Sequence, residues 1–129
     1  MTKTFYVLLQ RSFRSVFWAL LMLVTYLMLV ELAPKTGGWP YWDKVQHMAV
    51  FALLTTLAAL AYSQKMRWIM LGLLSYGALI ELLQGALTET RMASTGDWLA
   101  DAVGTLLVLA SIWLWRNCSN PKRLRTLHK

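Results

Sequence analysis

Ionisable side chains recur at helical spacing inside or beside long apolar segments of this sequence. Asp43 and His47 are four residues apart, and so are Asp97 and Asp101. Side chains at that spacing share one face of a helix. An imidazole held by a carboxylate could act as a general base or as a metal ligand. Carboxylates could also hold a divalent cation such as Mg²⁺ through their oxygens.

Two more polar side chains share a helix face, because Glu81 and Gln84 are three residues apart. Arg91 could clamp a phosphate or a carboxylate. There is no HExxH motif and no cysteine pair, so a divalent cation is a candidate cofactor but no particular metal is indicated. We predict catalytic roles for His47, Asp43, Glu81 and Asp101, and substrate-binding roles for Gln84, Arg91, Ser94 and Asp97.

The composition indicates that membrane-spanning elements carry these residues. Of the 129 residues, 57% are hydrophobic and only 15% are charged, whereas soluble chains are nearer one quarter charged. The mean hydropathy is +0.46. Cys118 is the single cysteine, so no intrachain disulfide can form. These values exclude a disulfide-built secreted module and argue against a soluble enzyme or a disordered chain.

The apolar residues form four continuous runs, each about 18–20 residues long, which is the length a helix needs to cross a membrane. The runs are Val16–Ala33, Val45–Tyr62, Trp68–Leu87 and Trp98–Trp115. We therefore predict an all-α membrane protein with four transmembrane helices. It consists of an N-terminal segment (1–15), a membrane domain (16–115) and a basic tail (116–129). The first run is long and lacks a small-residue cleavage site, so we expect an uncleaved anchor.

Charge asymmetry predicts the orientation of the helices. Of the 13 Lys and Arg residues, all but Lys35, Lys44 and Arg91 lie on the side of the two termini. By the positive-inside rule both termini are then cytoplasmic, and loops 34–42 and 88–96 face outward. The net charge of +7 comes from residues that flank apolar runs, which indicates membrane lipids and not nucleic acid as partners. The basic tail is expected to rest on anionic lipid.

In this orientation all six acids lie on the outer side of the membrane. The helical rise places His47 and Asp101 each about 6 Å below a helix start, and Glu81 about 9 Å from a helix end. A charge at mid-membrane costs about 2.5–3.5 kcal/mol, and such groups usually pair and serve a function. We predict a polar pocket, formed by three helices, that opens to the outer leaflet.

Some of these residues also have structural interpretations. Asp43 with Gln46, and Ser94 with Asp97, have the spacing of helix capping boxes. Lys44 is expected to extend its ammonium to the interface. Arg91 could be an ordinary loop cation, and His47, Glu81, Gln84 and Asp101 could together form a polar clamp between helices.

In the order and spacing of these residues the chain resembles the VanZ-like family of small bacterial integral membrane proteins. The resemblance covers about half of the chain, from Asp43 to Gly104. The family patterns DKxxH, ExxQ and RxxSxxDxxxDxxG correspond to Asp43-Lys44-Val45-Gln46-His47, Glu81-Leu82-Leu83-Gln84, and Arg91, Ser94, Asp97, Asp101 and Gly104. The family's namesake is associated with resistance to the glycopeptide teicoplanin, although many relatives occur outside resistance clusters. The resemblance implies a multi-pass protein of the bacterial cytoplasmic membrane, and not a defined reaction.

Three functions fit these residues. The first is an outward-facing enzyme or binding protein for a lipid-linked or phosphorylated cell-envelope substrate. The second is a non-enzymatic accessory or assembly protein whose polar cluster is a helix clamp. The third, proton-coupled transport, fits less well because no acid offers a relay to the cytoplasmic side. The sequence leaves the oligomeric state open.

Overall fold

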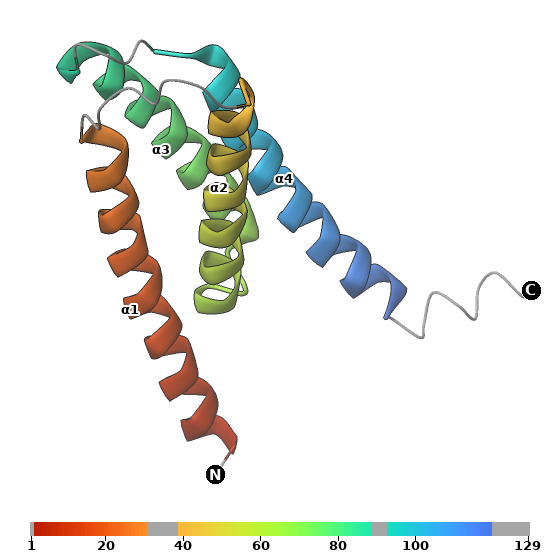
Figure 1. Cartoon of the computed structure of the whole chain (residues 1–129). Coiled ribbons are helices and arrows are strands. Elements are labelled where there is room, and N and C mark those ends of the chain that lie inside the picture. The colour runs from red at the N-terminus through yellow and green to blue at the C-terminus, as the bar shows by residue number, and fades with distance from the viewer. Residues whose placement is uncertain (1, 31–38, 89–92, 120–129) are drawn as a thin grey trace, which may run out of the picture.

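The computed structural model describes residues 2–30, 39–88 and 93–119, and all regular structure in these ranges is helical (Figure 1). The helices are α1 (Thr2–Leu29), α2 (Trp42–Ala61), α3 (Met66–Leu87) and α4 (Thr95–Cys118). All four are long and apolar enough to cross a membrane. The prediction of four membrane-length helices is confirmed, while the side on which the termini lie stays a prediction.

Helix α1 begins at Thr2, fourteen residues before the apolar run predicted to start at Val16. Segment 1–15 is therefore largely part of the first helix. Neither Gly nor Pro interrupts the chain before Pro34, and either residue would be costly in a helix interior. The 28 residues of α1 extend about 42 Å, which is more than the hydrocarbon core needs. Its first turns accordingly extend past the other helices in Figure 1.

The two predicted capping boxes have different outcomes. Helix α2 begins at Trp42 after Tyr41, and no side chain caps it. Asp43 lies inside the first turn of α2, where the helix dipole favours a carboxylate, so the predicted cap by Asp43 was wrong. Ser94 does cap α4, because its Oγ accepts a hydrogen bond from the backbone N–H of Asp97 at 3.3 Å.

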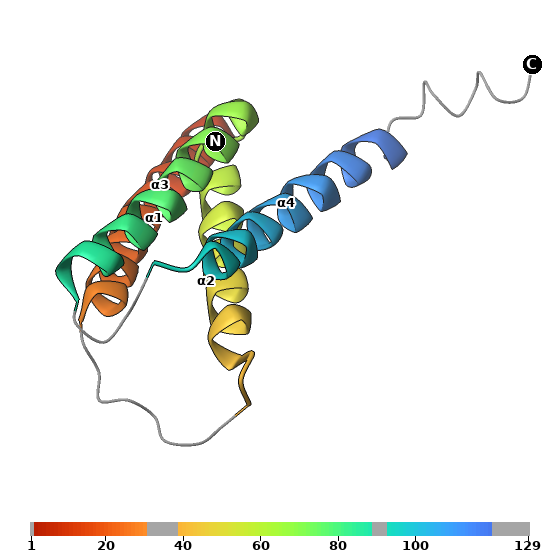
Figure 2. The ribbon, with the colours of Figure 1, turned by 90° about the horizontal axis from the view of Figure 1, so that it is seen from above.

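The described helices pack around α2, which contacts α1 on one side and α4 on the other. Phe51 and Leu54 of α2 are fully buried, and Ile80 of α3 is almost so. Helix α4 crosses α2 near its own start and then diverges from the bundle, as Figures 1 and 2 both show. Consequently the buried residues of α4 lie in its first half: Asp101, Gly104 and Thr105.

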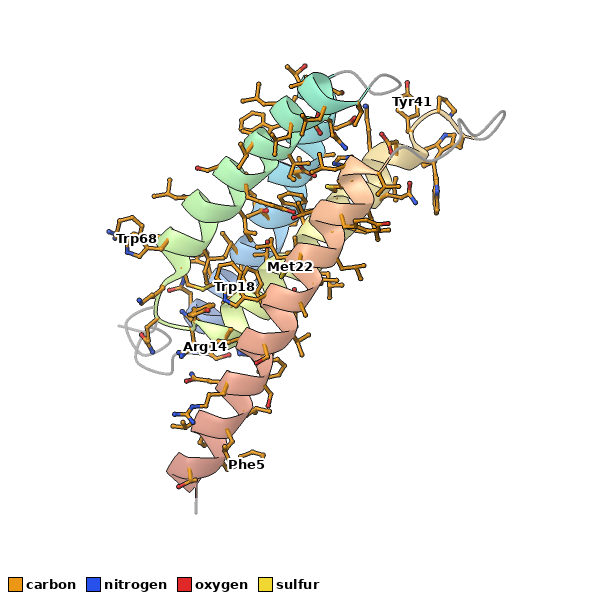
Figure 3. All side chains as sticks on the ribbon, turned by 90° about the vertical axis from the view of Figure 1, so that its left-hand side faces the viewer. Phe5, Arg14, Trp18, Met22, Tyr41 and Trp68 are labelled. Atoms are coloured by element: carbon orange, nitrogen blue, oxygen red, sulfur yellow. The ribbon has the colours of Figure 1, made fainter. Side chains whose placement is uncertain are left out.

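The outside of the bundle is apolar, as expected for a surface that faces lipid (Figure 3). Met22 of α1 and Trp68 of α3 are each 72% exposed. Those predicted site residues that the structure describes instead gather where α2 and α4 begin and α3 ends, at the upper end of Figure 1. The fold therefore places polar groups at one end of a bundle whose outer surface is apolar.

Candidate functional site

Three buried ionisable side chains from three helices form an inner cluster: His47 of α2, Glu81 of α3 and Asp101 of α4. Their exposed fractions are 3%, 5% and 0%. His47 Nδ1 lies 2.9 Å from Asp101 Oδ1, a hydrogen-bond distance, and 4.0 Å from Glu81 Oε1. The structure thus brings together three of the four residues predicted to be catalytic, whereas their catalytic role stays a prediction.

Aromatic residues and a glycine pack against the inner cluster. Phe51 follows His47 by one helical turn and stacks on Tyr76 of α3, with ring centroids 5.8 Å apart. A Cβ atom at Gly77 would lie 3.0 Å from Asp101 Oδ2 and 3.3 Å from the Phe51 ring. Glycine at position 77 therefore leaves room for the Asp101 carboxylate against α3. The rings of Phe51 and Tyr76 give the cluster a weakly polar environment, in which electrostatic interactions are strong.

Glu81 also connects α3 to the start of α4. Its Oε2 accepts a hydrogen bond of 2.8 Å from the backbone N–H of Ser94. Because the Ser94 hydroxyl caps α4, Ser94 serves the local structure through both its backbone and its side chain. Ser94 thus has a structural role, and its substrate-binding role stays a prediction.

Gln84 lies one turn from Glu81 but contacts a different helix. Its Nε2 donates a buried hydrogen bond of 2.8 Å to the carbonyl oxygen of Met28 in the last turn of α1. The last carbonyls of a helix have no partner within the helix. Gln84 therefore satisfies one such group and holds the end of α1 against α3. Its predicted contact with a substrate stays a prediction.

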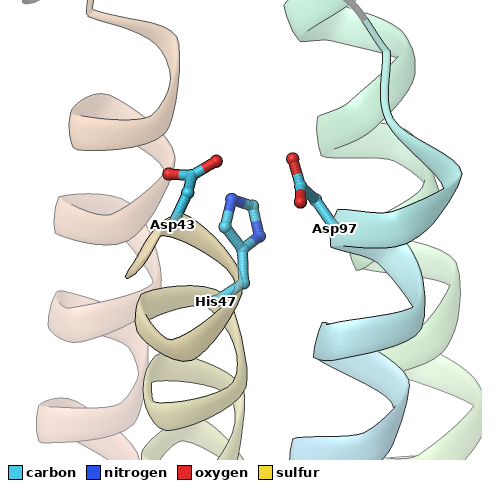
Figure 4. Close-up of side chains that lie close together, drawn as sticks. All are labelled: Asp43, His47 and Asp97. Atoms are coloured by element: carbon cyan, nitrogen blue, oxygen red, sulfur yellow. The ribbon is translucent and has the colours of Figure 1, made fainter. Parts of the chain in front are cut away.

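An outer group lies above the inner cluster and shares His47 with it. Figure 4 shows Asp43 of α2 and Asp97 of α4 on opposite sides of the imidazole. One potential donor atom from each of the three residues lies within 4.8 Å of the others. Asp43 is exposed and Asp97 is half-buried. Both acids therefore lie on the more accessible side of His47, and we call this side the entrance to the cluster.

Lys44 belongs to this entrance, although its position in the sequence predicted an ammonium that extends to the membrane interface. Its Nζ lies 2.7 Å from Asp97 Oδ1, an ion pair between residues 53 positions apart in sequence. A Cβ at Gly96 would lie 3.1 Å from that Nζ, so glycine leaves room for the pair. In the sequence, only the position of Lys44 next to Asp43 in the DKxxH pattern indicated that it belongs to the site. The spacing of residues could not predict that its partner is on α4.

Arg91, predicted to bind substrate, lies outside the described residues, and so do Glu31 and Glu89. Among the described residues, Glu81 Oε1 and Asp101 Oδ2 are buried without a hydrogen-bond partner. Buried polar atoms normally have such a partner. The inner cluster therefore retains two acceptor oxygens that could contact a bound group.

A groove on α1, α2 and α3 shares no residue with the inner cluster. Arg14 lies over the Tyr62 ring near this groove, with its guanidinium carbon 5.0 Å from the ring centroid, and Trp18 donates to the Tyr62 hydroxyl at 3.1 Å. The lining is apolar and aromatic apart from Lys65: Phe17, Trp18, Leu21, Ala58, Tyr62, Lys65, Trp68, Ile69, Gly72, Leu73 and Tyr76. Acids and histidine are absent from this lining, so the candidate chemistry lies at the inner cluster.

The described residues thus form four helices that are long and apolar enough to span a membrane, with a buried His–Glu–Asp cluster near one end of the bundle. Comparisons with protein-family models, with curated proteins and with solved structures found no match to this chain.

Proposed function

We propose that this chain is a VanZ-like multi-pass protein of the bacterial cytoplasmic membrane with an outward-facing polar site. The site binds, or acts on, a lipid-linked or phosphorylated cell-envelope substrate. The observation that carries this proposal is the burial of His47, Glu81 and Asp101 on three helices of membrane length. Ionisable groups placed inside a membrane are costly and commonly mark substrate or ion sites. A link to teicoplanin resistance would follow from the family resemblance alone.

Lys44 supplies the entrance with a cation for a phosphorylated substrate, beside the carboxylates of Asp43 and Asp97. Lys44 is 42% exposed at its side chain and could turn from Asp97 to a phosphate group, which an ammonium binds as a point charge. Arg91 is the predicted second cation. His47, hydrogen-bonded to Asp101, is suited to accept a proton from a substrate hydroxyl or from water. A cation for the phosphate group and a buried base are the two parts that such a site needs.

Native mass spectrometry of detergent-purified protein tests this proposal. We compare the wild type with His47→Ala and Asp101→Asn, and with Gln46→Ala as the matched control. Gln46 precedes His47 but is exposed. We expect a phospholipid or lipid-linked precursor adduct on the wild type and the control that is lost from both site variants. Identical adducts on all four well-folded proteins would refute a binding site at the inner cluster.

A non-enzymatic accessory or assembly function is the second candidate, and the interhelical hydrogen bonds favour it. The pairs His47–Asp101, Glu81–Ser94 and Gln84–Met28 each connect different helices or their flanking turns. Such contacts average about 0.6 kcal/mol in a membrane and reach about 1.7 kcal/mol. If the cluster is a clamp, His47→Ala should lower the folded yield. The wild type should then carry no lipid adduct.

A further inference from the structure

The inner cluster has the donor atoms of a metal site. An imidazole nitrogen and oxygens of two carboxylates lie together, with one donor atom from each residue within 4.8 Å of the other two. We propose that His47, Glu81 and Asp101 bind one divalent transition-metal ion, such as Zn²⁺ or Mn²⁺. This inference deepens the proposed function and rests on it, because the ion would lie beneath the same substrate entrance.

The separations among these atoms match ligands of a single ion. Zn²⁺ binds nitrogen and oxygen at about 2.0–2.1 Å in a tetrahedral arrangement, so any two of its ligands are about 3.4 Å apart. His47 Nδ1 lies 2.9 Å from Asp101 Oδ1 and 4.0 Å from Glu81 Oε1. One distance is shorter and the other longer than this separation, each by about half an ångström, so an ion could contact all three residues after small side-chain movements.

Unsatisfied oxygens supply an independent reason for a ligand. Glu81 Oε1 and Asp101 Oδ2 lack a hydrogen-bond partner among the described residues. The side chains that carry them are only 7% and 1% exposed. Leaving buried polar atoms without a partner is unfavourable, and metal coordination is one way to satisfy them. Glu81 Oε1 is also the atom nearest His47 Nδ1 on that carboxylate, so it points into the cluster.

The balance of charge favours the same ligand. Two ionised carboxylates carry two negative charges, and a protonated imidazole supplies at most one positive charge against them. A divalent cation with a neutral imidazole balances the cluster completely. Balanced charge matters here because Glu81 and Asp101 are buried, and an uncompensated buried charge is strongly destabilising.

The outer group of Asp43, His47 and Asp97 also has three potential ligands, but its surroundings oppose a cation. The ammonium of Lys44 lies 2.7 Å from Asp97 and would repel a metal ion there. Asp43 is exposed, whereas every member of the inner cluster is buried. The imidazole ligand also indicates the kind of ion, because histidine suits Zn²⁺ and related metals better than Mg²⁺ or Ca²⁺.

With Nδ1 bound to the ion, the other ring nitrogen of His47 carries the proton, so His47 would serve as a ligand and not as the base. The ion would polarise a phosphoryl oxygen of the substrate and stabilise the negative charge on it. Lys44 and Asp97 would then form the entrance and not the metal site. The inner cluster and the entrance are thus separable by substitution, and the experiment uses this difference.

The test is direct metal binding to the full chain in detergent, without substrate. Protein stripped with a chelator is titrated with Zn²⁺ and, separately, with Mn²⁺ by calorimetry, and bound metal is counted by elemental mass spectrometry. We compare the wild type with Glu81→Gln, His47→Gln and Asp43→Asn. Glutamine at position 81 keeps an acceptor for the Ser94 N–H, and circular dichroism verifies that each variant is folded. Should Glu81→Gln not fold, Asp101→Asn replaces it.

We expect one metal ion per wild-type chain, a loss of affinity of at least about tenfold in Glu81→Gln and His47→Gln, and unchanged stoichiometry in Asp43→Asn. Adding Zn²⁺ should raise the melting temperature only of those proteins that bind the ion. Failure of the wild type to bind either metal would overturn the inference. So would a loss of binding in Asp43→Asn that spares Glu81→Gln. If the wild type binds neither metal but carries a lipid adduct that is lost in His47→Ala, the proposed function stands while the metal is rejected.

Discussion

Replacing Gly104 with alanine tests the close approach of α2 and α4 that positions Asp101. A Cβ at position 104 would overlap the backbone carbonyl oxygen of Met48 and lie 3.2 Å from the backbone nitrogen of Ala52. Backbone atoms cannot rotate away as a flexible side chain can, so α4 must move relative to α2. Because Asp101 lies three residues before Gly104, that movement would also alter the hydrogen bond between Asp101 and His47.

A matched substitution isolates the magnitude of this effect. Gly72 is also a helical glycine, but a Cβ there would meet nothing within 4 Å. Alanine favours helix over glycine by about 1 kcal/mol at both positions, so that gain cancels in the comparison. Overpacking costs about 1–3 kcal/mol, and only Gly104→Ala incurs it. We therefore expect Gly104→Ala to be less stable than Gly72→Ala by about 1–3 kcal/mol, which is roughly a 5- to 150-fold difference in the unfolding equilibrium.

The assay is unfolding in mixed detergent micelles, in which the mole fraction of sodium dodecyl sulfate is raised and helicity is followed by circular dichroism. The free energies of unfolding of the two variants and the wild type are compared at one micelle composition. Equal free energies for Gly104→Ala and Gly72→Ala would refute the close α2–α4 crossing. A stability loss in Gly72→Ala alone would contradict both the open space beside Gly72 in α3 and the close packing at Gly104 in α4.

Further substitutions and one labelling experiment test individual contacts and the orientation. Gln84→Leu should lower the free energy of unfolding by about 0.6–1.7 kcal/mol in the same assay, whereas Gln46→Leu, on the exposed side of α2, should not. Equal effects of these two variants would contradict the bond from α3 to the end of α1. Tyr76→Phe should cost about 0.6 kcal/mol by removing its hydrogen bond with α1, whereas Tyr26→Phe, 64% exposed, should be neutral. Cys118, the single and exposed cysteine, should react with a membrane-impermeant maleimide in inverted vesicles but not in intact cells, and labelling of intact cells would reject the cytoplasmic C-terminus.

The sequence determined the four membrane-length helices because span length and apolar content are local properties of the chain. An apolar run of about 20 residues has to form its backbone hydrogen bonds internally once it is in lipid, and a helix achieves this within one segment. The start of α1 at Thr2 was less predictable, since residues 4–15 combine apolar and polar side chains without a helix breaker. The apolar run marks the part of α1 that needs lipid, and not the whole helix.

The sequence also singled out His47, Glu81 and Asp101, because a charged residue deep in an apolar segment is costly wherever the helices lie. Helical rise alone placed these residues at a similar depth. Depth along a helix is therefore readable from one sequence. The rotation of a helix about its axis and the identity of the neighbouring helix cannot be predicted in this way.

Only the tertiary structure decided which polar groups meet. The partners of His47, Lys44 and Gln84 lie 54, 53 and 56 residues away in sequence, and each pairing depends on how two helices cross. Those crossings depend in turn on whether small residues such as Gly77 and Gly104 let two helices approach closely. Spacing along a single helix carries no information about this contact, which is why Gln84 contacts α1 and not the cluster, and why Lys44 pairs with Asp97.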